Sequence, residues 1–423
     1  MSLLPSAGPL RHPAFAWYLA SRGVNLLGTT AATVALAFAV LDLGGSTTAL
    51  GQVLAARTLP MVALLLFGGV LADRLPRSLV LQASNLSSGL LQAATAALLL
   101  TGHAPLWAVV VLQALQGAAT GVGWPAMAGM VPTLVPADEL QRANALVSMT
   151  RGLTAVAGPS LGTLLVVTVG SGWAVLADAA AWFVAAVLLL PVRRSAPRRA
   201  PAERAGPRAS TLVELREGWR LFRRTTWLWV VVAAFGVLNA IGGGAWLTLG
   251  PALAEDTIGR QAWGWALSAE AAGALLGTVA LLRVRMPRPL LVGLPAVALL
   301  GLPMIALGLD ARVLPLLVLT CVAGVGLEVF GMGWNLAVQE NVPEAQLSRA
   351  YSYDALGSLV AMPVGQLVYG PLGDRFGVGP VVLWSGVAYV VIALLVLLSR
   401  SVRRLPRAPS PRTAADPATA APG

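Results

Sequence analysis

Seven ionisable side chains lie inside long apolar runs, where a charge is energetically expensive and a functional role is the default expectation. The basic ones are Arg22, Arg57 and Arg151, and the acidic ones are Asp178, Glu270, Glu328 and Asp354. All three arginines fall in the first half of the chain, whereas three of the four acids fall in the second half. A buried carboxylate that gains or loses an arginine neighbour changes its proton affinity. Such groups are therefore suited to proton coupling.

Asp354 and Glu270 are the preferred candidates for a proton carrier, because both lie among small residues that indicate packed or cavity-lining faces. Glu328 ranks third, since its run places it nearer the inner side, and Asp178 is expected to be shallow on the outer side. The alternative is that these charges form fixed structural pairs or face a water-filled vestibule. Asp42, at the outer end of the first run, is expected to be a cap or gate residue.

The composition requires lipid as the solvent of the elements that carry these charges. Hydrophobic residues make up 57% and charged residues 11% of the chain, and the mean hydropathy is +0.76. A soluble domain carries about 25% charged residues. A span needs about 20 apolar residues, and only helices or closed barrels satisfy their backbone polar groups in lipid. The runs do not alternate as barrel strands would, so we expect an all-α membrane protein with twelve transmembrane helices.

The twelve predicted spans share high hydropathy and short connections. They lie at residues 14–41, 47–72, 78–101, 105–131, 142–168, 172–192, 226–252, 262–282, 289–309, 312–338, 346–371 and 377–399.

Arginine positions predict the orientation. Of the 29 arginines, 23 fall in loops on one side of these spans, three fall on the other side and three lie inside spans. Basic loops remain in the cytoplasm, so we expect a multi-pass protein of the cell membrane with both termini cytoplasmic. Because the arginines are confined to these loops, the net charge of +11 indicates no nucleic-acid partner.

Four regions follow from this layout. A six-helix half over residues 1–192 precedes a basic cytoplasmic linker over 193–225, a second six-helix half over 226–400 and a disordered tail over 401–423. The last part of the linker places apolar residues at helical spacing and is expected to form an amphipathic helix on the membrane surface. Two repeated halves with a site between them are typical of transporters.

One loop carries a family resemblance. Gly69, Asp73, Arg74 and Arg77 follow the second span with the spacing Gly-x-x-x-Asp-Arg-x-x-Arg. This resembles the signature loop of the major facilitator superfamily, although Pro76 stands where the family usually has glycine. The resemblance covers the whole chain, and several phrases look closest to the branch of drug and siderophore exporters.

The resemblance implies two pseudo-symmetric halves and a gate at this loop. It implies that Asp73 lies near the cytoplasmic end of the eleventh span, in a charge contact that breaks during transport. Arg74 and Arg77 would pair with acids such as Asp138 or Glu139.

Two further patterns concern the coupling of transport to protons. Gly152, Gly158, Pro159 and Gly162 in the fifth span resemble the glycine-proline motif of family antiporters, in which small residues permit close helix crossing. Many family antiporters also carry an arginine in the fourth span, where this chain has Gln113. If protons are coupled, another group must carry the charge.

Polar and aromatic residues inside spans are candidates for a substrate cavity. Trp124 and Trp334 are deep and each follows a glycine, although tryptophan also belongs at membrane interfaces. The full set is Asn25, Gln113, Trp124, Asn239, Trp334 and Asn335.

These observations favour a secondary active transporter that exports a small, partly apolar molecule by proton antiport. The alternatives are an importer or facilitator of the same fold, or a membrane sensor that transports nothing. One cysteine, two histidines and the lack of a nucleotide-binding loop argue against an enzyme, a metal site and ATP as a directly bound energy source. We expect no cofactor, and a monomer whose partners are its substrate, protons and lipid.

Overall fold

A computed structural model describes residues 8–74, 76–102, 104–195, 222–223, 225–284 and 286–405 of the chain. This part contains helices and no strands. The prediction of an all-α membrane protein with twelve spans is confirmed. The predicted amphipathic helix of the linker and most of the predicted tail lie outside the described residues.

The first six spans are single helices, except that the sixth is interrupted at Leu189. They are α1 (Pro13–Asp42), α2 (Thr47–Arg74), α3 (Arg77–Leu100), α4 (Leu106–Ala128), α5 (Leu140–Val169) and α6 (Ser171–Leu188), and α6 continues through the short α7 (Leu190–Ser195). Three 3-10 turns flank them: η1 (Pro9–Arg11), η2 (Val131–Thr133) and η3 (Ala137–Glu139). When α7 is counted as the end of the sixth span, the observed ends of the six spans lie within three residues of the predicted ones.

The last six spans include broken ones. The seventh consists of α9 (Thr226–Ile241), the π-helical η4 (Gly242–Leu249) and α10 (Gly250–Asp256). The others are α11 (Arg260–Leu281), α12 (Pro289–Ala298) with α13 (Gly301–Leu309), α14 (Val313–Asn341), α15 (Glu344–Leu359) with α16 (Ala361–Phe376), and α17 (Val378–Leu395) with η5 (Val396–Leu398) and α18 (Arg400–Arg403). Four of these six spans are therefore not single α-helices as the sequence predicted, in part near prolines that cannot donate to the helix ladder.

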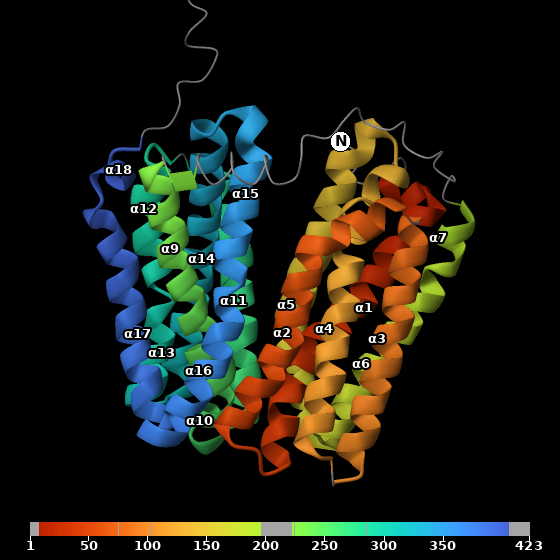
Figure 1. Cartoon of the computed structure of the whole chain (residues 1–423), viewed down its shortest axis with the longest axis horizontal. Coiled ribbons are helices and arrows are strands. Elements are labelled where there is room, and N and C mark those ends of the chain that lie inside the picture. The colour runs from red at the N-terminus through yellow and green to blue at the C-terminus, as the bar shows by residue number, and fades with distance from the viewer. Residues whose placement is uncertain are drawn as a thin grey trace, which may run out of the picture.

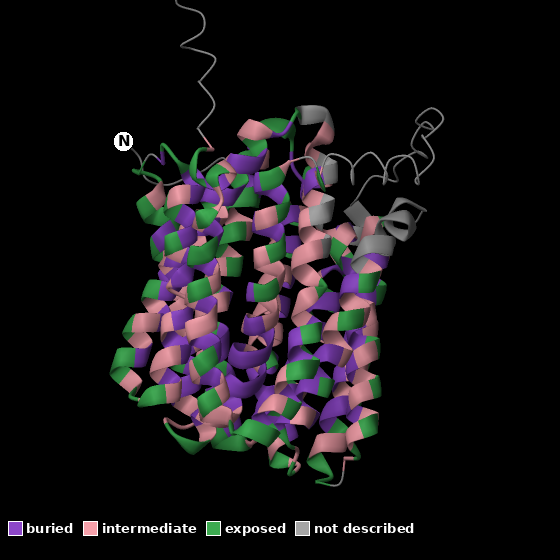
Figure 2. Cartoon of the chain, turned by 60° about the vertical axis from the view of Figure 1, so that its left-hand side comes forward, coloured by how far each residue is buried: buried purple, intermediate pink, exposed green. Residues whose placement is uncertain are grey.

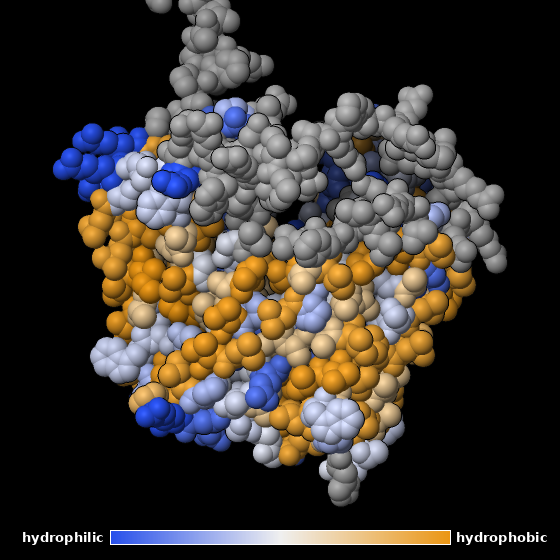
Figure 3. Space-filling model, viewed as in Figure 1, coloured by the Kyte–Doolittle hydropathy of each residue, from blue (hydrophilic) through white to orange (hydrophobic). Residues whose placement is uncertain are grey.

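The surface of the bundle is suited to lipid. Nine helical stretches of the described residues are each long and apolar enough to cross a membrane. Large hydrophobic side chains such as Leu90, Leu282 and Trp384 are exposed. Buried residues lie between the helices (Figure 2). A hydrophobic belt separates hydrophilic regions at the two ends of the molecule (Figure 3).

The helices form two groups, α1–α7 and α9–α18, which diverge toward one end of the bundle (Figure 1). We call the end that carries Pro13 and Thr226 the linker side, and the end that carries Asp42 and Arg260 the far side. Far-side turns are tight: Gly170 and Gly259 adopt positive φ values of 95° and 85°, a backbone region that favours glycine. These turns join α5 to α6 in the first half and α10 to α11 in the second half.

Helices within each half cross at glycines. Gly117 of α4 lies against the backbone carbonyl of Arg57 in α2. Gly273 of α11 lies against Cys321 of α14, and Gly324 of α14 lies against the backbone carbonyl of Glu270 in α11. Small residues allow this approach, because association in lipid depends on close packing.

A matched pair of substitutions in α14 tests this packing. A Cβ atom on Gly324 would overlap the carbonyl oxygen of Glu270, whereas a Cβ atom on Gly331 meets open space. We expect Gly324→Ala to lower the free energy of unfolding by about 1–3 kcal/mol. Gly331→Ala should be neutral or stabilise the helix by up to about 1 kcal/mol. Thermal unfolding of the detergent-purified variants measures both, and an equal loss in the two would contradict the packing.

Candidate functional site

The two favoured acids of the second half each accept a hydrogen bond from a tryptophan. The indole nitrogen of Trp246 donates to Glu270 over 3.2 Å, and that of Trp334 donates to Asp354 over 2.9 Å. Ser358 donates to the second oxygen of Asp354 over 3.3 Å. Glu270 and Trp246 line a cavity of about 170 Å³ whose other walls are mostly apolar. Each carboxylate thus has a neutral partner in place of an arginine.

Asp178 is buried in the helix packing of the first half. It follows the start of α6 by two turns and is 1% exposed. Gln92 donates to it over 2.6 Å and Trp182 over 3.3 Å, while Gln113 donates to Gln92 over 3.1 Å. The carboxylate therefore lies among polar partners of its own half, and its shallow location on the outer side stays a prediction.

No ion pair joins an intramembrane arginine to an intramembrane acid among the side chains that the structure describes. Arg57 and Asp178 attract each other across the first half without direct contact. Glu328 packs near Gly277. The hypothesis that arginines pair with these acids is therefore not realised in this conformation.

Arg151 faces a polar space between the halves. Asn144, Ser148 and Arg151 are all exposed and lie on one face of α5, at spacings of four and three residues. The exposed apolar residues Met149 and Leu153 lie on the opposite face, since successive residues turn by about 100° in a helix. A polar stripe cannot face hydrocarbon, so Met149 and Leu153 face lipid and Arg151 faces water between the two halves.

The predicted cavity residues divide between this space and the packed interior. Trp124 is 46% exposed and lies on the face of α4 opposite the exposed Leu115, which places it away from the lipid-facing side of that helix. Gln113 is fully buried in the Asp178 network and does not line the space. Asn335 is exposed and accepts a hydrogen bond from Tyr351 over 3.3 Å. Asn239 of α9 is partly buried.

Two predicted residues of this set are buried beside other site residues. Asn25 is 7% exposed and lies one turn after Arg22 on α1. Trp334 is also 7% exposed and packs edge-on against Trp227, with ring centroids 6.0 Å apart. Its indole nitrogen donates a hydrogen bond to Asp354, so the ring is directed toward that carboxylate.

The gate loop is described in part. Gly69, Asp73 and Arg74 lie in the last turns of α2, where the structure describes the backbone alone. Arg77 begins α3 and donates to the backbone carbonyl of Gly129. The expected pairing of Arg77 with Glu139 is not formed.

Glu139 is bound by the N-terminal segment, which the sequence did not indicate. It pairs with Arg11 over 2.7 Å and with His12 over 3.1 Å. These contacts hold the start of α1 against the loop before α5. No spacing in the sequence relates residues 127 positions apart, so the interaction could not be predicted.

The glycine-proline motif of α5 joins two neighbours. Gly158 and Gly162 pack against Thr30 and Ala31 of α1. Gly152, on another face, contacts Leu275 of α11 in the second half. The motif therefore lies where α5 meets both its own half and the other.

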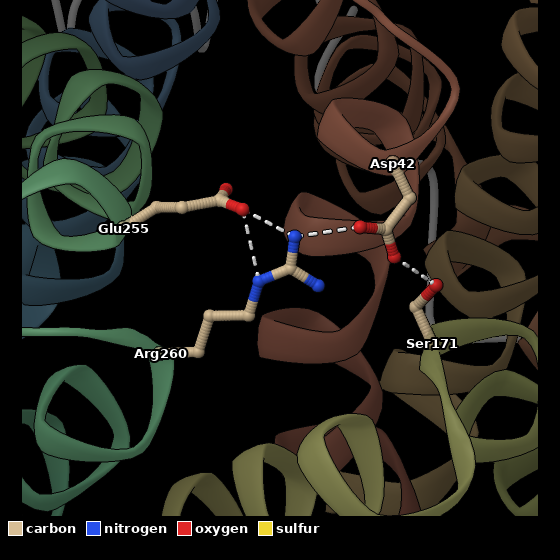
Figure 4. Close-up of polar contacts among 4 residues, drawn as sticks. All are labelled: Asp42, Ser171, Glu255 and Arg260. Carbon is tan, nitrogen blue, oxygen red and sulfur yellow. Dashed lines mark hydrogen bonds and ion pairs between the residues drawn. The ribbon is translucent and has the colours of Figure 1, made fainter.

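An arginine connects the halves at the far side. Arg260 of α11 contacts Asp42 of α1 over 2.6 Å and Glu255 of its own half over 3.1 Å, and it lies between the two acids (Figure 4). Ser171 donates to the other oxygen of Asp42 over 2.6 Å. The guanidinium also lies 5.0 Å from the ring centroid of Phe38. Asp42 thus joins the two halves through Arg260, a partner that the sequence did not indicate, and its role as a cap or gate residue stays a prediction.

A second contact between the halves caps a helix. The backbone amides of Thr47 and Thr48, at the start of α2, each donate to Asp374 of α16 over 3.2 Å, and the Thr48 hydroxyl donates over 2.6 Å. A carboxylate is favourable at a helix N-terminus. Burial alone would raise the pKa of Asp374, but the hydrogen bonds from Thr48, Thr47 and Ser46 outweigh it and lower that pKa below its ordinary value. The cap therefore stays charged. We call the Asp42–Arg260 and Asp374–α2 contacts together the far-side latch.

Twelve membrane helices in two groups, with charged groups at mid-membrane and a latch at one end, define a membrane transport protein. The chain belongs to the Major Facilitator Superfamily, whose family model matches residues 19–361.

Known proteins resemble the chain over nearly its whole length. The enterobactin exporter EntS of Escherichia coli (strain SMS-3-5 / SECEC) is 27% identical, with 96% of each chain covered. The solved nucleoside transporter NupG has a TM-score of 0.71 at 13% identity, covering 91% of this chain and 98% of its own. A bacterial homologue of the iron transporter ferroportin, in an inward-facing state, has a TM-score of 0.67 at 17% identity, covering 94% and 99%. The structural likeness shows the fold.

Removing the latch arginine should open the far side. A partly exposed ion pair is worth about 0.2–1 kcal/mol, so we expect Arg260→Gln to shift the ratio of far-side-open to far-side-closed molecules by up to about fivefold. Labels on Thr101→Cys and Thr257→Cys, in a Cys321→Ser background, report the distance between the halves by electron paramagnetic resonance. Arg312→Gln, which removes an arginine paired with Asp310 in the same half, is the control. An identical distance distribution in Arg260→Gln and the control would rule out the latch.

Proposed function

We propose that this chain is a proton-coupled antiporter that exports a small, partly apolar molecule such as a drug, an antibiotic or a siderophore-like metabolite. The halves are joined at the far side and diverge toward the linker side. We place the linker side and both termini in the cytoplasm, because most arginines lie there. In this orientation the space beside Arg151 opens to the cytoplasm, where an exporter loads its substrate.

The direction of transport is supported by the relatives. Proteins described as enterobactin exporters are 27% identical over 96% of the chain. Enterobactin is the cargo of those proteins, and we carry over only export of a small molecule. The proposal requires no cofactor and takes the monomer as the functional unit.

The observation that carries proton coupling is that Glu270 and Asp354 have neutral indole partners. If a carboxylate paired with arginine were protonated, it would leave an uncompensated cation in a medium of low dielectric constant. An indole donor can hydrogen-bond to the carbonyl oxygen of the neutral acid as well as to the carboxylate. Glu270 and Asp354 can therefore take up a proton without leaving an unpaired cation, and release of the proton leaves a carboxylate that the indole donor still hydrogen-bonds.

Deletion of the gene tests export in cells. We expect deletion to raise the intracellular accumulation of at least one compound in a panel of fluorescent dyes, antibiotics and siderophore-like molecules. A protonophore should produce the same accumulation in the parent strain, because the driving force is removed. Accumulation that ignores the protonophore would contradict proton coupling.

Two substitutions test the carriers. We expect Asp354→Asn and Glu270→Gln to abolish substrate-induced proton movement in proteoliposomes that contain a pH-sensitive dye, since an amide cannot titrate. Both should still insert and elute as folded protein. Asp310→Asn, which removes an acid from the far-side surface, should behave as wild type. Normal proton movement in both carrier variants would refute the assignment.

A further inference from the structure

Two arginines from different helices lie at a similar depth where α1 crosses α5. Gly23 of α1 approaches Thr150 of α5, so their neighbours Arg22 and Arg151 flank the same crossing. Arg22 lies nine residues after the start of α1 and Arg151 eleven after the start of α5, roughly 14 Å and 17 Å from the linker-side ends of their helices. Their like charges repel each other.

Neither arginine has a counter-ion among the acids whose side chains the structure describes. Arg22 donates to the thioether sulfur of Met127 over 2.7 Å and to the amide oxygen of Asn25 over 3.4 Å. A thioether is a weak acceptor, so much of the hydrogen-bonding capacity of this guanidinium is unused. Two cations that repel each other and lack a counter-ion are unfavourable, and an anion would offset that repulsion.

Asn25 supplies a third donor at the same place. Its amide oxygen is taken by Arg22, while its amide nitrogen is buried and has no hydrogen-bond partner. Buried polar groups are nearly always paired. The free groups of Arg22, Asn25 and Arg151 are therefore all donors, which is the arrangement that binds carboxylate or phosphate oxygens.

Trp124 gives this cluster an apolar neighbour. It precedes Met127 by three residues on α4, so it lies on the same face as the sulfur that contacts Arg22. Trp124 is 46% exposed, so its ring is accessible to a ligand. An aromatic surface next to paired guanidinium groups fits an aromatic or otherwise apolar molecule that carries a negative group.

We propose that Arg22, Arg151 and Asn25 form a binding site for an anionic group of the exported molecule, with Trp124 contacting its apolar part. The inference rests on the proposed function and names the chemical class of the substrate: an amphiphilic organic anion. The anion site lies in the first half and the proton carriers Glu270 and Asp354 lie in the second, so the two ligands do not compete for one group.

Three probes with one ring system and different charges test the site. These are 2-naphthoate, its uncharged amide and the naphthylmethylammonium cation, titrated by calorimetry into the full-length protein in detergent. We expect 2-naphthoate to bind more tightly than the amide and the cation to bind least. A charge-assisted hydrogen bond is worth enough that Arg22→Gln or Arg151→Gln should weaken 2-naphthoate about tenfold or more, with little effect on the amide.

Controls separate binding from folding. Arg312→Gln removes an arginine outside the site and should bind 2-naphthoate as wild type does. Arg22→Lys and Arg151→Lys keep the charge and should keep the preference for the anion. These variants still test the site if a glutamine variant fails to fold. Equal affinity for 2-naphthoate and its amide, or unchanged 2-naphthoate binding in folded glutamine variants, would overturn the proposal.

The result is distinguishable from a failure of the proposed function. A protein that prefers 2-naphthoate but moves no compound in cells or proteoliposomes would retain the site and contradict export. A protein that exports uncharged compounds and shows no preference for the anion would retain export and contradict the site.

Discussion

The contact between Asp374 and the start of α2 ties the two halves of the molecule together at the far side. The carboxylate from one half satisfies backbone amides of the other, at a helix end where no intrahelical acceptor exists. Arg260 adds a charged contact beside it. Because both lie at the far side, the helices diverge in the other direction. The polar face of α5 can then be hydrated, and mid-membrane charges such as Arg151 become tolerable.

The number and limits of the spans could be predicted because lipid imposes them. Every backbone polar group must be satisfied within its own helix, and apolar length together with flanking arginines then determines each boundary. The breaks at Val360 and between α12 and α13 could not be predicted. Pro363 and Pro295 lie near them, but Pro60 and Pro159 lie inside helices that continue. Whether a proline interrupts a helix depends on neighbours that compensate for the missing hydrogen bond.

The types of the site residues could be predicted, but their partners could not. An acid inside an apolar run is visible in the sequence, and Trp182 lies at helical spacing from Asp178. Trp246 and Trp334 lie 24 and 20 residues from the acids they serve and on other helices. For Gln113 the residue type was misleading, since it was predicted to line the substrate cavity and is fully buried. It is polar and deep, yet it faces the interior of its own half, because the direction of a side chain depends on helix rotation, which hydropathy does not reveal.

The π-helical segment η4 has a consequence for helix phase. Hydrogen bonds to the fifth residue replace those to the fourth, so each wide turn holds more residues than an α-turn. The helix that leaves η4 is therefore rotated about its axis relative to the helix that enters it. Trp246 lies within this segment, and its indole meets Glu270 only at the rotation that η4 imposes. A return to regular α-helical winding would turn the indole away from the carboxylate without any change in sequence. The winding of η4 and the hydrogen bond from Trp246 to Glu270 are thus coupled, because a change in one changes the other.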